Sequence, residues 1–139
     1  MSRRITGFWL VLAALSAGIA VATGAYASHG LSDARSIELF RIAGQYQMWH
    51  ALALGGVAAL ARFGGPGRGG WLLAAAGWCF LIGTLLFCGA LYLLAVQGPS
   101  LLGAVAPVGG LAFMAGWLAL AGVGMRWMMR SGEGRGPGG

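Results

Sequence analysis

Residues 69–125 read GGWLLAAAGWCFLIGTLLFCGALYLLAVQGPSLLGAVAPVGGLAFMAGWLALAGVGM and contain no charged side chain. The run has 57 residues, whereas one transmembrane helix needs about 20. Its clearest turn signal is Gln97-Gly98-Pro99-Ser100, where an amide, a Gly and a Pro cluster. Pro107 suits the first turn of a following helix, because the N–H that Pro lacks would have no partner there. The run therefore predicts two spans, at about residues 71–96 and 105–127.

Two further charge-free runs lie upstream, at residues 5–32 and 42–61, and predict helices at about residues 5–28 and 43–62. The whole chain is 58% hydrophobic and 9% charged, against about 25% charged residues in soluble domains. We therefore expect an all-α polytopic membrane protein, with residues 1–128 forming a single four-transmembrane-helix bundle. Residues 129–139 form a Gly-rich tail of low complexity and are predicted to be disordered.

The arginines predict the orientation. All nine positive residues are Arg, and seven lie at the N-terminus, in the second loop or at the C-terminus: Arg3, Arg4, Arg62, Arg68, Arg126, Arg130 and Arg135. Because positive residues concentrate on the cytoplasmic side, both termini are predicted to be cytoplasmic. The arginines form no basic stripe, which argues against a nucleic-acid partner.

The first helix has an alternative interpretation. Arg3-Arg4, an apolar run and Ala25-Tyr26-Ala27 also resemble a signal peptide with its cleavage site. The apolar run exceeds the roughly 7–15 residues usual for a signal peptide, and its loss would leave three spans. We therefore expect the segment to stay attached.

The external loop, residues 29–42, leaves two structures open. Ser32 would cap a short helix, and Arg35, Glu38 and Arg41 have the spacing of i,i+3 pairs. A short interfacial helix and a structured loop are both compatible with this pattern.

Small residues recur at four-residue spacing within the spans, as in Ala14, Gly18 and Ala22, and again in Ala112 and Gly116. Such residues permit close helix packing in lipid, and packing inside one bundle is the expectation for each stripe. Trp9, Trp71 and Trp127 lie near predicted cytoplasmic ends and are expected in an interfacial aromatic belt.

Polar side chains gather in the outer half of the predicted bundle. Within QYQMWHALAL, residues 45–54, the side chains of Tyr46, Gln47 and His50 share one helix face. Two residues of the third span fall at a similar depth, and one lies at the outer end of the first. The candidate cluster is His29, Tyr46, Gln47, His50, Cys88 and Tyr92.

Several roles are open for this cluster. Buried polar groups in lipid need partners, so interhelical hydrogen bonding is the simplest role. A small polar ligand would use the same groups. Two histidines would also suit a haem, and two histidines with Cys88 a soft metal, but we assign no metal and no cofactor. The only acids are Asp33, Glu38 and Glu133, and with no catalytic set the chain is not expected to be an enzyme.

Four blocks in order carry a resemblance: HGL at 29–31, YQMWHALAL at 46–54, GTLLFCGALYLLA at 83–95 and PVGGLAFMAGW at 107–117. Together they resemble the YgdD-like family of small integral membrane proteins, over about residues 7–122. The chain departs from the family pattern at Ala27-Ser28, where the family has Gly-Ala, and at Ala106, where it often has Thr. The resemblance implies four spans in the bacterial inner membrane, and it implies no reaction, substrate or catalytic residue.

The sequence therefore favours a non-enzymatic accessory, scaffold or subunit role in the bacterial inner membrane. Its expected partners are the lipid bilayer and either a larger membrane complex or further copies of the chain. One alternative is a protein that binds haem, a metal or a small polar ligand around His50. Another is an oligomeric channel for small solutes.

Overall fold

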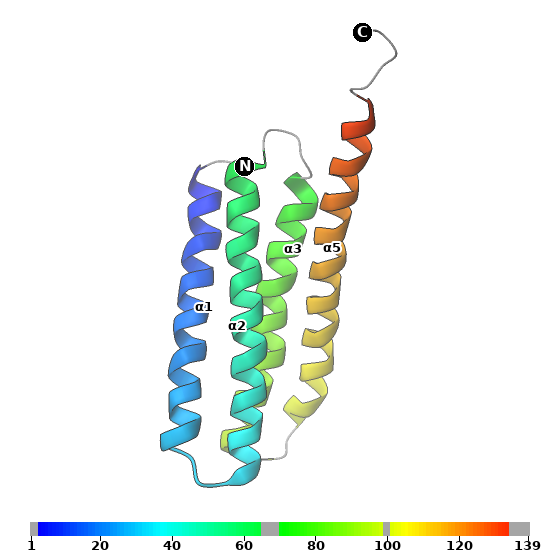
Figure 1. The fold of residues 1–139 in the computed structure, drawn as a ribbon. Helices are drawn as coiled ribbons and strands as arrows, with labels where there is room; N and C mark the ends of the chain where they lie inside the picture. The colour runs from blue at the N-terminus through cyan, green and yellow to red at the C-terminus, as the bar shows by residue number, and fades with distance from the viewer. Residues whose placement is uncertain (1–2, 65–69, 99–100, 134–139) are drawn as a thin grey trace.

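A computed structural model describes residues 3–64, 70–98 and 101–133, with side chains described as far as residue 129. This part of the chain is helical, without strands (Figure 1). Three of the four long helices are α1 (Arg3–His29), α2 (Ala34–Phe63) and α5 (Val105–Glu133), and the short 3-10 helix η2 (Leu101–Ala104) precedes α5. The fourth runs from α3 (Gly70–Gly83) through the π-helical segment η1 (Thr84–Cys88) into α4 (Gly89–Gln97). The prediction of an all-α, four-helix membrane protein is confirmed.

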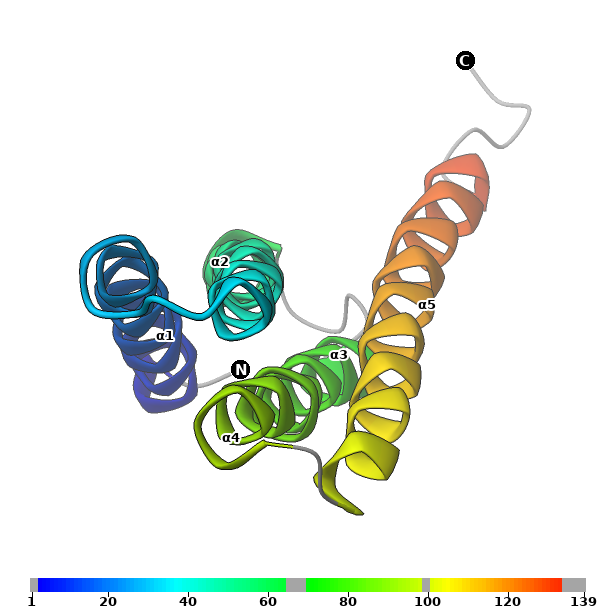
Figure 2. The same ribbon diagram turned by 90° about the horizontal axis from the view of Figure 1, so that it is seen from below.

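Three of the long helices are long and apolar enough to cross a membrane: Arg3–His29, Gly70–Gln97 and Leu101–Met129. The more polar α2 is not among them, and it occupies the middle of the molecule. It packs against α1 on one side and against α3, η1 and α4 on the other, while α5 packs against α3 (Figure 2). A polar helix is stable there because its neighbours cover it and supply partners for its side chains.

The beginning of α2 and the end of α5 differ from expectation. Residues 34–42 belong to α2 itself, so the connection between α1 and α2 spans only residues 30–33. The cap is Asp33 rather than Ser32, because the Asp33 carboxylate accepts hydrogen bonds from the Ser36 backbone N–H at 2.8 Å and from its hydroxyl at 2.9 Å. At the other end of the chain, α5 continues to Glu133, past the predicted start of the tail, and residues 134–139 lie outside the described part.

Glycine-aromatic contacts hold α5 against α3 and η1. A Cβ added at Gly109 would overlap the backbone nitrogen of Phe87, and one at Gly83 would overlap the Phe113 ring. Gly116 receives the edge of Phe80, whose carbon would lie 2.6 Å from such a Cβ. Because dispersion in lipid depends on close approach, these contacts position Phe113 and the rest of α5 opposite α2.

The small-residue stripe of α1 is exposed rather than packed within the bundle. A Cβ at Gly18 would meet nothing within 4 Å, and Ala14 and Ala22 are also exposed. Trp9 is the reverse case, since it is only 2% exposed and packs on Gly77 instead of lying in an interfacial belt. The outer face of α1 is thus open to lipid.

Candidate functional site

Gln47 is the centre of a polar network that joins three helices. Its side-chain N–H donates to the Ser16 carbonyl of α1 at 3.1 Å, and its oxygen accepts from the Tyr92 hydroxyl of α4 at 2.8 Å. The Thr23 hydroxyl of α1 lies 2.9 Å from the Tyr92 oxygen and 3.1 Å from the Ala20 carbonyl, so it shares one proton between two acceptors. Gln47 is only 5% exposed, and these bonds satisfy an amide that lipid could not solvate.

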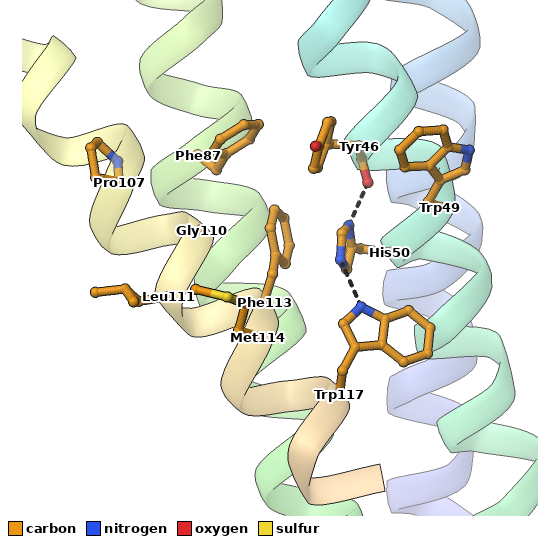
Figure 3. A pocket seen from close by; sticks show the side chains of 10 residues that line it. All are labelled: Tyr46, Trp49, His50, Phe87, Pro107, Gly110, Leu111, Phe113, Met114 and Trp117. Carbon is orange, nitrogen blue, oxygen red and sulfur yellow. Dashed lines mark hydrogen bonds between the residues drawn. The ribbon is translucent and has the colours of Figure 1, made fainter. Parts of the chain in front are cut away.

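His50 makes a second network, between α2 and α5. Its Nδ1 lies 2.7 Å from the Tyr46 carbonyl oxygen, and its Nε2 lies 3.2 Å from Nε1 of Trp117 (Figure 3). An indole N–H is only a donor, so Nε2 of His50 accepts and Nδ1 carries the proton that is donated to the carbonyl. The geometry therefore selects one neutral tautomer of an imidazole that is 4% exposed.

Aromatic rings enclose this imidazole. The Phe113 ring is stacked on it, with centroids 3.5 Å apart and planes inclined by 11°. Phe80 lies 5.6 Å from it, and the Trp117 ring lies 6.0 Å from it. The His50 ring therefore forms part of an aromatic wall as well as a hydrogen-bonding pair.

A lateral groove of about 750 Å³ lies between α2 and α5 beside this wall (Figure 3). Its lining is mainly aromatic and apolar: Tyr46, Trp49, His50, Phe87, Pro107, Gly110, Leu111, Phe113, Met114 and Trp117. The Trp117–His50 hydrogen bond crosses from one helix to the other at one end of the groove. Trp49 and Leu111 are 54% and 61% exposed, so the groove opens on the lipid-facing side of the protein.

The predicted cluster is divided by α2 into two parts. Gln47 and Tyr92 meet on one side of it, and Cys88, only 1% exposed, lines a small cavity with them. Tyr46 and His50 line the groove on the other side. His29, the last residue of α1, is exposed and lines neither of these spaces.

Sequence reasoning missed Trp117 and Thr23. Trp117 lies well inside the last span, where an indole N–H has no headgroup to bond, and this depth was the signal for a buried acceptor. Thr23 carries a hydroxyl in the C-terminal half of the first span, and that hydroxyl needed a partner for the same reason. The backbone carbonyl oxygens that accept hydrogen bonds in these two networks leave no signal in the sequence, because every residue carries one.

The described residues include no group of three or more His, Cys, Asp or Glu side chains that could hold a metal ion. A haem held by both histidines does not fit, because His29 and His50 do not line a common space and both nitrogens of His50 already have partners. What the arrangement offers chemically is an apolar, aromatic surface with one hydroxyl, that of Tyr46.

Comparisons with known proteins agree with a membrane protein of undefined activity. The family model described as "Protein of unknown function (DUF423)" matches residues 23–110. The chain is 38% identical over 116 residues to the UPF0382 membrane protein YwdK of Bacillus subtilis, covering 81% of this chain and 91% of that protein. It is 37% identical over 120 residues to a UPF0382 membrane protein of Haemophilus influenzae, covering 81% and 90%.

No solved structure matches the chain. The resemblance of its four sequence blocks to the YgdD-like family is confirmed by the family match and by relatives that are themselves named membrane proteins. This chain belongs to the DUF423 family.

Proposed function

We propose that this protein is a non-enzymatic accessory protein of the bacterial inner membrane that holds a lipid-soluble molecule in the groove between α2 and α5. The observation that carries the proposal is the groove itself. Its volume of about 750 Å³ falls within the roughly 300–1,000 Å³ usual for small-molecule sites. Its lining includes no carboxylate and no thiol, which favours binding over chemistry.

The lining defines the chemical class of the ligand. The rings of Tyr46, Phe87 and Phe113 lie along one wall, with the Tyr46 and Phe87 centroids 4.8 Å apart. Such rings stack on flat or unsaturated groups, each pair contributing about 0.5–1.5 kcal/mol beyond area burial. Since both nitrogens of His50 are already bonded, the Tyr46 hydroxyl is the partner for a polar head. The ligand is therefore an apolar molecule with a conjugated ring or unsaturated chain and one hydrogen-bonding group.

The location and orientation are part of the same proposal. The relatives in Bacillus subtilis and Haemophilus influenzae are named membrane proteins, and seven of the nine arginines favour cytoplasmic termini. Both described chain ends lie at one end of the helices, as an even number of spans requires (Figure 1). The protein would act as a multi-pass subunit, in contact with the bilayer and with either a larger complex or further copies of itself.

The experiment is ligand retention in a groove-filling variant. A Cβ at Gly110 meets only Phe87 Cδ2, at 4.0 Å, so Gly110→Leu would fill groove space without a backbone clash. Gly124→Leu is the matched control, because Gly124 lies on the same helix with nothing within 4 Å. Each protein is extracted in polymer-bounded native membrane discs, repurified and analysed by mass spectrometry of its lipid extract.

The expected result is one lipid-soluble compound that copurifies near 1:1 with the wild type and the control and falls at least about tenfold in Gly110→Leu. That fall corresponds to about 1.4 kcal/mol of lost affinity. Equal retention by all three proteins, or the same lipid profile as the bulk membrane in all three, would refute the proposal.

A further inference from the structure

A second space lies on the other side of α2, between α1 and the η1–α4 segment. It has a volume of about 170 Å³ and is lined by Ile19, Gln47, Thr84, Leu85, Cys88, Gly89 and Tyr92. Unlike the groove between α2 and α5, this cavity combines an amide, two hydroxyls and a thiol within a small volume. It is independent of the groove and of the ligand proposed for it.

Thr84 contributes a hydroxyl that has no described partner. The side chain is 8% exposed, and its Oγ1 is buried without a hydrogen bond in the part of the chain that the structure describes. Threonine in a helix commonly returns its hydroxyl to a carbonyl three or four residues earlier, as Thr23 does towards Ala20 at 3.1 Å. Thr84 stands at the first position of the π-helical segment η1 and makes no such bond.

An unpaired hydroxyl in this position is unfavourable. Moving a hydroxyl from water into an apolar environment without a new hydrogen bond costs roughly 2–7 kcal/mol. Because the surroundings are lipid and packed helices, bulk water offers no compensation. The Thr84 hydroxyl therefore needs a partner that is not a protein atom.

The cavity can provide that partner. A cavity needs about 10–15 Å³ of accessible volume to hold one water molecule, and the water needs two to four polar partners. The cavity exceeds this volume several times over. Gln47 has capacity left, since its bonds to Ser16 and Tyr92 use one N–H and one lone pair of the two of each that an amide carries. Thr84, Gln47 and Tyr92 thus surround a space suited to a small hydrogen-bonding guest.

We infer that this cavity is a binding site for water, held between the Thr84 hydroxyl and the Gln47–Tyr92 pair. Water is the small neutral molecule that both donates and accepts, and Thr84 and Gln47 each offer both functions there. The bound water extends the network that begins at Thr23 as far as η1. Helical segments with π geometry are frequent at functional sites, and here the segment brings an otherwise unpaired hydroxyl to a hydrated cavity within the membrane.

X-ray hydroxyl-radical footprinting tests this inference, because ordered water beside a side chain produces radicals that label it. The full-length protein is irradiated in lipid nanodiscs and labelling is read by mass spectrometry. Cys88 is the reporter, since it is 1% exposed and lines the cavity. Cys79, partly exposed on α3 and absent from the cavity lining, is the internal reference. Thr84→Val removes the hydroxyl while keeping the shape, and Thr84→Ser retains the hydroxyl.

We expect Cys88 to be labelled in the wild type and in Thr84→Ser, and its labelling relative to Cys79 to fall at least about fivefold in Thr84→Val. Far-ultraviolet circular dichroism and gel filtration verify that each variant is folded. An unlabelled Cys88 in the folded wild type would show a dry cavity and overturn the inference. Undiminished labelling in Thr84→Val would overturn it as well. Neither result bears on the ligand proposed for the groove between α2 and α5.

Discussion

The hydrogen bond between Trp117 and His50 should couple α5 to α2 energetically. Hydrogen bonds between membrane helices average about 0.6 kcal/mol and reach about 1.7 kcal/mol. The separation of 3.2 Å lies at the long end of the range for N–H donors, so we expect a coupling free energy of about 0.6–1 kcal/mol in a double-mutant cycle of Trp117→Phe and His50→Phe. Both substitutions keep an aromatic ring and remove the bonded nitrogens.

The single variants should cost more than the coupling. Trp117→Phe loses the N–H and part of the ring contact with Phe80, whose centroid lies 5.1 Å away. His50→Phe loses two hydrogen bonds and leaves the indole N–H unpaired in lipid. We expect each to lower the free energy of unfolding by about 1–2 kcal/mol.

Unfolding can be measured by titrating the protein from mild detergent into dodecyl sulfate. Cys88 is 1% exposed, so pulse labelling of its thiol in a Cys79→Ala background reports the unfolded fraction. Trp78→Phe is the matched control for Trp117→Phe, because the two indoles are 50% and 49% exposed and Trp78 lies on α3 against Trp9. A coupling between His50 and Trp117 no larger than that between His50 and Trp78 would refute the interaction, since distant sites add within about 0.3–0.5 kcal/mol.

Three further predictions concern the close contacts, the cap and the orientation. Gly109→Ala should destabilise the fold by about 1–3 kcal/mol, because the new methyl overlaps a backbone nitrogen, whereas Gly124→Ala should be neutral or slightly stabilising in the same titration. Hydrogen bonds from Ser36 hold the pKa of Asp33 below its ordinary value of 3.8. The stability that the ionised Asp33 cap contributes is therefore present above pH 3.8 and is lost as the pH falls through the pKa of Asp33 in the folded protein. Thermal denaturation should show that Asp33→Asn loses less stability in acid than the wild type does, and equal losses would contradict the assignment. Reporter fusions after residues 31 and 139 should report opposite compartments, and a shared compartment would contradict the proposed orientation.

The number of helices could be predicted because lipid imposes a simple length rule on charge-free runs. The turn after Gln97 followed from its Gly and Pro, and Gly98 indeed has a positive φ of 79°. The beginning of α2 could not be predicted in the same way. Its first two turns carry Arg35, Glu38 and Arg41, and a hydropathy argument treats such charges as loop even where Asp33 caps a helix.

The candidate site was predicted in part for a similar reason. Depth along each helix could be counted from the sequence, and Gln47 and Tyr92 do meet. The sequence does not reveal which helices are neighbours, because this depends on contacts such as Phe87 against Gly109, which places α5 beside η1. His50 therefore pairs with Trp117, on the helix that contributed no residue to the predicted cluster.

The central position of α2 has a consequence for biogenesis. This helix is not among those that are long and apolar enough to qualify as membrane spans. Its polar side chains form hydrogen bonds with α1, α4 and α5. It should therefore enter the bilayer together with α1, to which it is joined by residues 30–33 alone. A nascent chain that ends at Phe63 still lacks Tyr92 as the partner of Gln47 and Trp117 as the partner of His50. Both polar networks are complete only when α4 and α5 have joined α1 and α2 in the bilayer.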